Sequence, residues 1–556
     1  MNHIYCAALL LLASAFLQPA SAECRILKRG LSRNLLLTGA TVLTVDGALG
    51  GSSSSSSSSS SSIDPVVFVQ EGKIAYVGDI CGLGPSKGGS HSGSKVGSSY
   101  GHRYYDDASV VDCPGSVISP GFINTHEHLD YSTVAPLPDI QGGQRPKHRH
   151  DWRVGARGNT MREVAVNGSA IKAAAWGELR HVFSGTTSLI GAGMAPGLAR
   201  NLDFPDGLED NSHPLSPRVV IYDTFPLRDS HGIQRTGDCD YGANAIDSAT
   251  SALYHRYIPH VGEGVDPTAA NEFICLSNAT FDTTPSVSVS GDRDGDGNGG
   301  GLSTDILAPN VALVHALGLS PSDFDLLAAR GAMVVWSPRS NMALYGTTLD
   351  VTYLLSAGIT VALGTDWLPS GSATMGREAI CAAAASKALY GAEIPARKLW
   401  EMATVNAARV AGYEDELGSL SAGKLADIVI FSGESESESS QSSHSREPGG
   451  STKKRRDPYE QAIFAPQKSI ELVLRGGKIL LASLRLKDLT TTTTTTGFCE
   501  DVAFGNANSK IVCVTDELGM SFGDLEASLG GVYPAVLPEI PPYEPSCRTD
   551  TYIPTS

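Results

Sequence analysis

The chain is short of basic residues, and after its first two dozen residues it has no long apolar run. Its 42 Lys and Arg residues face 59 Asp and Glu residues, and the resulting net charge of −17 is spread along the chain. Nucleic acid is disfavoured as a partner because phosphate binding needs a basic stripe. A bilayer span needs about 20 apolar residues, so we expect no stable membrane span once the N-terminus is removed. The hydrophobic share of 41% in 556 residues still supports a sizeable globular core.

The N-terminal segment lacks Lys and Arg but carries an apolar core at residues 7–13, followed by Ala20-Ser21-Ala22. A short apolar core before a small-x-small triplet is typical of a secretory signal peptide, here residues 1–22. The alternative is a membrane anchor, for which the apolar stretch is too short. The sequence therefore predicts a secreted or extracytoplasmic protein.

Cysteine pairing is only partly constrained by the sequence. Loss of Cys6 with the signal peptide leaves nine of the ten cysteines, an odd number, so at least one thiol is expected to be free or bonded to another chain. Cys499, Cys513 and Cys547 lie in a tail that buries little core, where disulfide bridges commonly stabilise structure. We expect bridges in this tail and leave their connectivity open.

Several polar tracts are predicted to be insertions, because they cannot bury enough apolar surface to order themselves. They are a serine run at 52–62, a Gly/Ser-rich tract at 84–101, an Asp/Gly-rich tract at 291–301, a polar insert at 432–457 and a threonine run at 490–496.

Without the insertions, short β-rich segments stand at both ends of an alternating middle. Strands at the two ends can pair into one small β-sandwich, and near-continuous Val/Ile/Leu strands separated by helices indicate a parallel sheet buried on both faces. The predicted fold class is α/β, a (β/α)8 TIM-type barrel with a small β-sandwich domain. The end strands are 34–45, 66–77, 109–111, 426–431 and 470–481. The middle strands are 117–124, 186–190, 219–223, 257–260, 311–315, 332–336 and 359–364, with helices at 170–183, 321–330, 351–357 and 376–389.

This pattern divides the chain into five parts. They are the signal peptide (1–22), the N-terminal part of the β-sandwich (23–115), the barrel (116–412), the C-terminal part of the β-sandwich (413–485) and a low-complexity, cysteine-containing extension (486–556).

The most informative motif is His126-x-His128, which comes directly after the apolar run 116–123. Alternate side chains of a strand share one face, so the two imidazoles, about 6.6 Å apart along the backbone, can point at one place. A metal ion is the expected occupant of that place.

His260, His315 and Asp366 each end or follow a predicted strand, which we number five, six and eight. Barrel enzymes place their chemistry at the carboxyl ends of strands. A single histidine at such a position is usually a core or surface residue, and Gly364-Thr365-Asp366 alone is also compatible with a turn or a helix N-cap. The whole set of nitrogen and oxygen donors is what zinc or iron requires.

A second pair with the same spacing, His148 and His150, lies among Arg145, Lys147 and Arg153. We expect a loop at the mouth of the site there and no metal ligand.

Taken together, these motifs resemble the amidohydrolase superfamily, most closely its single-metal branch of cytosine, guanine and S-adenosylhomocysteine deaminases and chlorotriazine hydrolases. The resemblance covers most of residues 35–482 apart from the insertions. The matching motifs are residues 120–128, 260–263, 314–315, 337–344, 363–366 and 422–428.

The resemblance implies that one divalent metal, zinc first and iron as the alternative, is bound by four residues, and that His315 lies beside the attacking water. The implied ligands are His126, His128, His260 and Asp366. The fourth strand, 218–225, offers no lysine, so the carbamylated lysine that bridges two metals in other branches is absent.

A divalent metal brings the pKa of a bound water to about 7 in favourable sites, which supplies a nucleophile at neutral pH. His315 and Asp366 are then expected to take and orient its proton, and Glu263, three residues after His260, to protonate the departing nitrogen. Without the neighbouring histidines, Glu263 would be read as a surface acid. Arg339, Asn341 and Trp367 lie near the predicted rim as candidate substrate contacts.

The predicted function is metal-dependent hydrolysis of non-peptide C–N bonds in a small molecule, with deamination of a heterocyclic amine favoured. The alternatives are hydrolysis of a cyclic amide or another leaving group on the same scaffold, and a secreted binding protein without turnover. Rim loops vary independently of the scaffold, so the substrate and the oligomeric state stay open.

Overall fold

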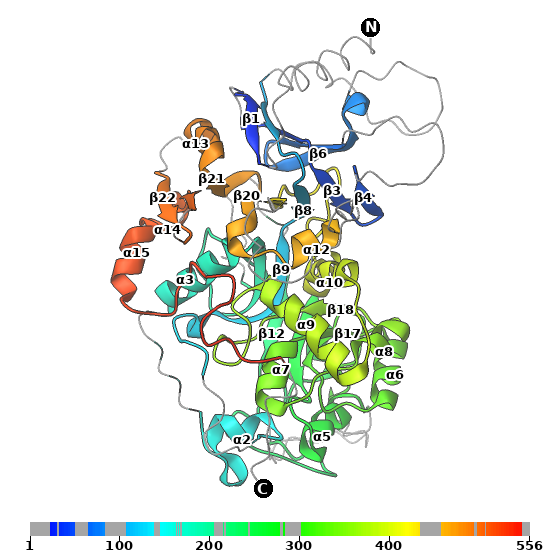
Figure 1. Cartoon of the computed structure of the whole chain (residues 1–556). Helices are drawn as coiled ribbons and strands as arrows, with labels where there is room; N and C mark the ends of the chain where they lie inside the picture. Colours follow the sequence, from blue (N-terminus) through cyan, green and yellow to red (C-terminus); the bar gives the residue numbers. More distant parts are fainter. Residues whose placement is uncertain are drawn as a thin grey trace, which may run out of the picture.

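A computed structural model describes most of the chain (Figure 1). The described residues are 23–30, 33–50, 65–83, 107–137, 145–162, 164, 166, 169–204, 215, 218–242, 245–278, 282–283, 302–433, 457–493, 498–505 and 508–547. The predicted signal peptide and four of the predicted insertions fall wholly or mostly outside these residues, as does the end of the threonine run.

Eight parallel strands of the described chain form two sheets. The three-stranded sheet has the order β11 (Arg200–Asn201), β10 (Thr186–Ala192), β9 (Phe122–His128). The five-stranded sheet has the order β12 (Val220–Asp223), β13 (Arg256–Val261), β16 (Ala312–His315), β17 (Met333–Trp336), β18 (Val361–Leu363). An isolated parallel bridge between Glu127 and Asp366 joins β9 to the end of β18. No strand pairing among the described residues joins β11 to β12.

Two parts of the strand prediction need correction. The predicted strand 117–124 is two elements, because the chain leaves one sheet at β8 (Val117–Pro120) and enters another at β9 on either side of Gly121. The third parallel strand, β11, is absent from the prediction because two residues carry no detectable periodicity.

Helices follow most of the parallel strands, and their ends carry ordinary stop and start signals. In α6 (Pro321–Arg330), Ser320 and Asp323 form a capping box, Pro321 occupies the first turn, and Gly331 ends the helix with φ of 71°. The remaining helices are α2 (Arg149–Val154), α3 (Ala170–Val182), α4 (Ser248–Ser251), α5 (Pro267–Leu276), α7 (Pro338–Tyr345), α8 (Val351–Ser356), α9 (Met375–Tyr390), α10 (Ala396–Ala403), α11 (Val405–Ala411), α12 (Pro458–Ile463), α13 (Lys487–Thr493), α14 (Thr515–Leu518) and α15 (Phe522–Leu529).

Two further sheets lie above the parallel strands in Figure 1, and the larger one combines strands from both ends of the chain, as the sequence predicts. One has the order β1 (Arg25–Lys28), β7 (Ser109–Asp112), β2 (Leu35–Thr38), β5 (Pro65–Gln70), β6 (Lys73–Asp79). The other has the order β22 (Glu500–Ala503), β23 (Ser509–Val512), β21 (Lys478–Ser483), β20 (Ile470–Arg475), β19 (Ile428–Phe431), β8, β3 (Thr41–Thr44), β4 (Gly47–Leu49). Both contribute to one apolar cluster that contains Leu37, Val67, Ile430 and Leu472. A short hairpin of β14 (Asp282–Thr283) and β15 (Leu302–Ser303) stands apart.

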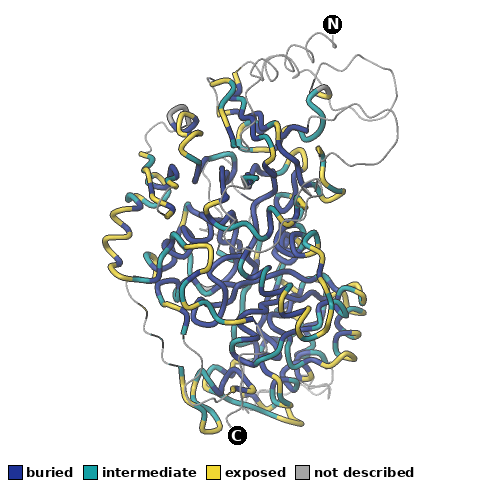
Figure 2. The backbone as a smooth tube through the Cα atoms, in the orientation of Figure 1, coloured by how far each residue is buried: buried dark blue, intermediate teal, exposed yellow. Residues whose placement is uncertain are grey.

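Burial follows this arrangement. The parallel strands β16, β17 and β18 are buried at every residue, which explains their unbroken apolar sequences. Figure 2 shows the buried backbone along the interior strands and the exposed residues on peripheral elements such as α15. No helix in the described part of the chain is long and apolar enough to cross a membrane.

The described part of the C-terminal extension returns to the helices around the parallel strands. Its β22 and β23 extend the eight-stranded sheet, and the segment after α15 runs beside α7 and α9 (Figure 1). There Glu544 pairs with Arg377 and lies 3.4 Å from Arg339, and Cys547 forms a disulfide with Cys381 of α9. The extension is therefore fastened to the helices that surround the parallel strands.

Eight cysteines pair within the described chain, and the predicted bridges in the tail are present. The four disulfides are Cys24–Cys113, Cys239–Cys275, Cys381–Cys547 and Cys499–Cys513, of which the last two involve the tail.

Replacing Cys381 and Cys547 together by Ser is expected to lower the free energy of unfolding by about 2–4 kcal/mol, because this bridge closes a loop of 166 residues. The matched control is the Cys499 and Cys513 pair, which closes only 14 residues and should cost less. Thermal unfolding of both Ser pairs under identical conditions checks this order. An equal loss of stability in the two pairs would contradict it.

Candidate metal centre and active site

Donor atoms from β9, β13 and the end of β18 meet in one place. His126 and His128 both lie within β9, and their Nε2 atoms are 3.4 Å apart. Nε2 of His260 lies 3.2 Å from Nε2 of His126, and Asp366 Oδ1 lies 3.2 Å from the same atom. Two donors bound to one zinc ion at about 2.0–2.1 Å lie roughly 3–3.5 Å apart, so this set fits a single divalent cation.

The imidazole rings are oriented so that Nε2 faces the cluster. His260 Nδ1 lies 3.3 Å from the carbonyl oxygen of Asp223, and since a carbonyl only accepts, Nδ1 carries the hydrogen. His126 Nδ1 lies 2.8 Å from Ser337 Oγ. Burial lowers the pKa of His128 to about 4, which keeps its ring neutral at pH 7. A neutral imidazole whose other nitrogen is hydrogen-bonded is the form in which histidine binds metals.

Asp366 is placed by direct contacts between β9 and the residues after β18. Its amide donates to the His126 carbonyl oxygen at 2.8 Å, and the Thr365 amide donates to the Asn124 side-chain oxygen at 3.1 Å. Position 364 must be glycine, because a Cβ there would lie 2.4 Å from the His126 Cβ. Asp366 itself has φ of 60°, a strained conformation for a non-glycine residue that surrounding contacts maintain.

His315 lies beside this donor set and shares the strained backbone, with φ of 67°. Its Nδ1 lies 3.1 Å from Asn341 Oδ1, an acceptor, which leaves Nε2 free to accept a proton. Nε2 lies 3.8 Å from Asp366 Oδ2 and 3.8 Å from Glu263 Oε2. Asn341 thus orients His315, and its predicted contact with substrate stays a prediction.

Glu263 presents a carboxyl group to the same space. Glu263 is 4% exposed, and burial raises the pKa of its carboxyl above that of an ordinary glutamate. Tyr345 donates its hydroxyl to Oε1 at 2.8 Å, while Oε2 faces His315. A carboxyl with a raised pKa holds its proton to higher pH than an exposed glutamate does, which suits general acid chemistry.

The two remaining predicted rim residues lie in different surroundings. The Trp367 ring packs 5.0 Å from Trp152 and 5.2 Å from Tyr131, and its buried indole N–H has no acceptor among the described residues. Arg339 donates to Ser372 and to the carbonyl oxygen of Pro545 in the C-terminal extension. This geometry favours Trp367 over Arg339 as a substrate contact.

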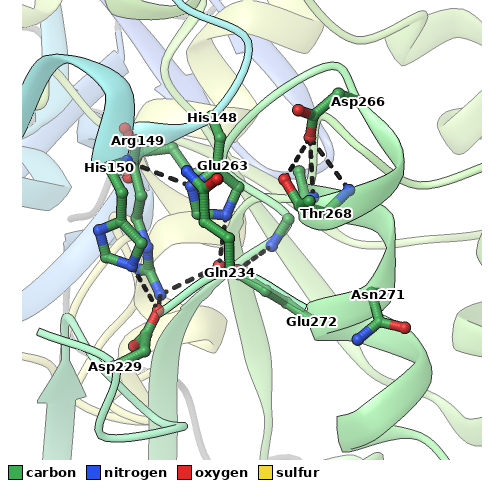
Figure 3. Close-up of polar contacts among 12 residues, drawn as sticks. His148, Arg149, His150, Asp229, Gln234, Glu263, Asp266, Thr268, Asn271 and Glu272 are labelled. Atoms are coloured by element: carbon green, nitrogen blue, oxygen red, sulfur yellow. Dashed lines mark hydrogen bonds and ion pairs between the residues drawn. The ribbon is translucent and has the colours of Figure 1, made fainter. Parts of the chain in front are cut away.

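The second histidine pair, His148 and His150, lies at the start of helix α2 and not in a strand (Figure 3). His148 Nε2 lies 3.0 Å from Glu272, and His150 Nε2 lies 2.8 Å from Asp229. Arg149, fully buried between them, contacts both carboxylates at 3.2 and 2.8 Å. The pair belongs to a buried ionic network and is more deeply buried than a loop at the mouth of the site would be. That it binds no metal stays a prediction.

Sequence reasoning missed three aromatic residues at the site. The Tyr222 hydroxyl lies 3.0 Å from His128 Nε2 and 3.4 Å from His260 Nε2, at the strand where other branches carry lysine. Tyr345 and Trp152 form a hydrogen-bond chain to Glu263. Only Tyr222 had a usable signal, since it lies near the carboxyl end of a predicted strand.

The chain is similar to known hydrolases and deaminases. The family profile described as Amidohydrolase family matches residues 289–480. A 5-methylthioadenosine/S-adenosylhomocysteine deaminase of Moorella thermoacetica is 31% identical over 408 residues, which cover 68% of this chain and 85% of the relative. A 5′-deoxyadenosine deaminase of Methanothermobacter thermautotrophicus is 26% identical over 408 residues, 69% of this chain and 86% of the relative.

Among solved structures, a zinc-complexed atrazine chlorohydrolase of Arthrobacter aurescens TC1 aligns with a TM-score of 0.49 at 16% identity, over 83% of this chain and 100% of that one. The alignment with the Moorella deaminase, which extends over most of the relative, decides the assignment. The chain belongs to the amidohydrolase family and is a hydrolase of non-peptide carbon–nitrogen bonds.

Proposed function

We propose that the protein is a zinc-dependent deaminase of adenosine-like heterocyclic amines. The observation that carries this proposal is the buried carboxyl of Glu263, with Oε2 3.8 Å from His315 Nε2, beside four donors spaced for one cation. The deaminase names of the aligned relatives support an aminopurine nucleoside as substrate.

A bound zinc ion would polarise water towards hydroxide and so supply a nucleophile at neutral pH. Asp366 and His315 are placed to accept and hold the proton of the attacking water, because both face the same space. Glu263 delivers its proton to the ring nitrogen next to the attacked carbon, regains the water-derived proton through His315, and then protonates the amino group. The proton that the added hydroxyl loses as the carbonyl forms restores Glu263. The carbon–nitrogen bond then breaks, ammonia leaves, and a carbonyl replaces the amino group. Trp367 offers its unpaired indole N–H and its ring face to the heterocycle.

The proposed scaffold is a closed (β/α)8 barrel capped by a β-sandwich. The eight parallel strands support the barrel, because their order places β9 next to β18 and β12 at the far edge. The apolar cluster shared by the two mixed sheets supports the sandwich.

We also propose that the protein is exported. Four disulfides within the described residues support an oxidising compartment, where such bonds persist. N-terminal sequencing of protein secreted by an expression host tests this proposal. A mature protein that begins near Glu23 is expected, and an intact N-terminus in the cytoplasm would overturn it.

Ammonia release tests the proposed reaction. Purified zinc-loaded protein is assayed against 5′-methylthioadenosine, 5′-deoxyadenosine, S-adenosylhomocysteine and adenosine, with dihydrouracil representing cyclic amides. Stoichiometric ammonia and the 6-oxo product from at least one nucleoside are expected. Ring opening of dihydrouracil with no nucleoside turnover would instead favour the cyclic amidase alternative.

A further inference from the structure

A hydrogen-bond chain with a fixed direction ends on Glu263. The Trp152 indole nitrogen lies 2.9 Å from the Tyr345 hydroxyl oxygen, which lies 2.8 Å from Glu263 Oε1. An indole N–H only donates, so the Tyr345 oxygen must accept from it. The single hydroxyl hydrogen of Tyr345 is then donated to Oε1.

We propose that Trp152 and Tyr345 are positioning residues that direct the proton of Glu263 to Oε2. A protonated carboxyl has one carbonyl oxygen and one hydroxyl oxygen, and the oxygen that accepts from Tyr345 is the carbonyl oxygen. The proton therefore resides on Oε2, the oxygen 3.8 Å from His315 Nε2, where the proposed reaction needs it. Only this catalytic consequence rests on the proposed function.

Helix α2 holds the donor end of the chain in place. The Arg149 amide donates to the Glu263 carbonyl oxygen at 3.0 Å, and the Val265 amide donates to the Lys147 carbonyl oxygen at 2.7 Å. Both bonds tie the start of α2 to the turn that carries Glu263, and Figure 3 shows Arg149 and Glu263 on these two segments. The Trp152 ring is further held by its stacking on Trp367 at 5.0 Å.

The ionic network around Arg149 also holds the turn that carries Glu263. Glu272 contacts Arg149 through Oε1 and accepts from the Gly262 amide through Oε2 at 2.9 Å. Arg149 also donates to the carbonyl oxygen of Thr224 at 2.7 Å. Backbone and side chain of Glu263 are thus both set by α2, which explains why three charged or polar residues of this short helix are buried.

The direct test is infrared difference spectroscopy of the zinc-loaded protein across the titration of Glu263. The carboxylic C=O band that is absent from a Glu263→Gln variant belongs to Glu263. In Tyr345→Phe this band is expected at higher wavenumber, because its carbonyl oxygen has lost a hydrogen bond. Tyr353 is the matched control, since its hydroxyl donates to Asp325 at 2.6 Å on the surface, and Tyr353→Phe should leave the band in place. An unmoved band in Tyr345→Phe would overturn the proposal.

Kinetics on 5′-methylthioadenosine separate positioning from packing. Tyr345→Phe is expected to lower kcat about 10-fold or more, within the range of one hydrogen bond to an ionisable group, with KM changed less than about threefold. Trp152→Phe keeps the aromatic face and should lose less. The double variant should be no slower than Tyr345→Phe, because the indole N–H of Trp152 acts only through Tyr345 and Phe keeps the aromatic stack on Trp367.

Additive losses in the double variant would show independent packing effects and would overturn the proposal. Failure of the wild-type protein to release ammonia from any nucleoside would instead overturn the proposed function, and the infrared comparison would still decide the direction of the hydrogen-bond chain.

Discussion

Replacing Asp366 by Asn is expected to lower kcat/KM by about 10⁴-fold or more, the upper range for loss of a positioned proton acceptor, and to weaken metal binding as well. Asp366 combines two roles in the proposed mechanism, since Oδ1 faces the imidazole donors and Oδ2 faces His315. An amide cannot accept the proton of the attacking water. Ammonia release and metal content, measured on the same preparation, check both effects.

Asp325 provides the matched control for this variant. It is a carboxylate whose described contact is with Tyr353 at the protein surface. Asp325→Asn should retain full turnover and full metal content. Turnover by Asp366→Asn within tenfold of the wild-type value would contradict the proposed role of Asp366.

Replacing Glu263 by Gln is expected to lower kcat by about 10²–10⁴-fold while leaving metal content unchanged, because a glutamine of the same shape cannot deliver a proton. The variant also tests pH dependence. Burial raises the pKa of Glu263, so its acid form persists to higher pH than in an exposed glutamate and is lost as pH rises through the raised value. The wild-type rate should therefore fall on the alkaline side, and the Glu263→Gln profile should lack that limb. Full turnover by this variant would remove Glu263 from the mechanism.

The convergence of the donor side chains was the most predictable part of the molecule. His126 and His128 point to one place because strand side chains alternate. His260 and Asp366 lie near them because parallel strands end at the same edge. Both rules depend only on local sequence and strand order. Helix α6 was predictable for the same reason, since its capping residues lie within the helix or next to it.

The residues that position the Glu263 side chain were not predictable from the sequence. Tyr345 and Trp152 are 82 and 193 residues away from their hydrogen-bond acceptors, and no local pattern reports such contacts. The role of Arg339 was obscured in a similar way, because its partners in the C-terminal extension lie more than two hundred residues later. A residue's position at the end of a strand predicted that it lies at the site. The sequence did not predict which distant side chains contact one another outside the strands.

The two His-x-His pairs illustrate the limit of motif spacing. In β9 the spacing places both rings on one face, whereas at the start of α2 it places His148 and His150 on different carboxylates, Glu272 and Asp229. Flanking sequence separated the two cases, since an apolar run precedes the first pair and basic residues surround the second. Secondary structure therefore decides whether the spacing makes a metal site.

Metal analysis of the purified protein tests the central claim most directly. The account predicts about one equivalent of zinc or iron per chain in the wild type, and loss of that metal in a His126→Ala, His128→Ala double variant that remains folded, because two of the four donors are then missing. The matched pair His148→Ala and His150→Ala should keep the metal. A wild-type protein that binds no divalent metal, or a His126→Ala, His128→Ala variant that binds it as tightly, would contradict the account.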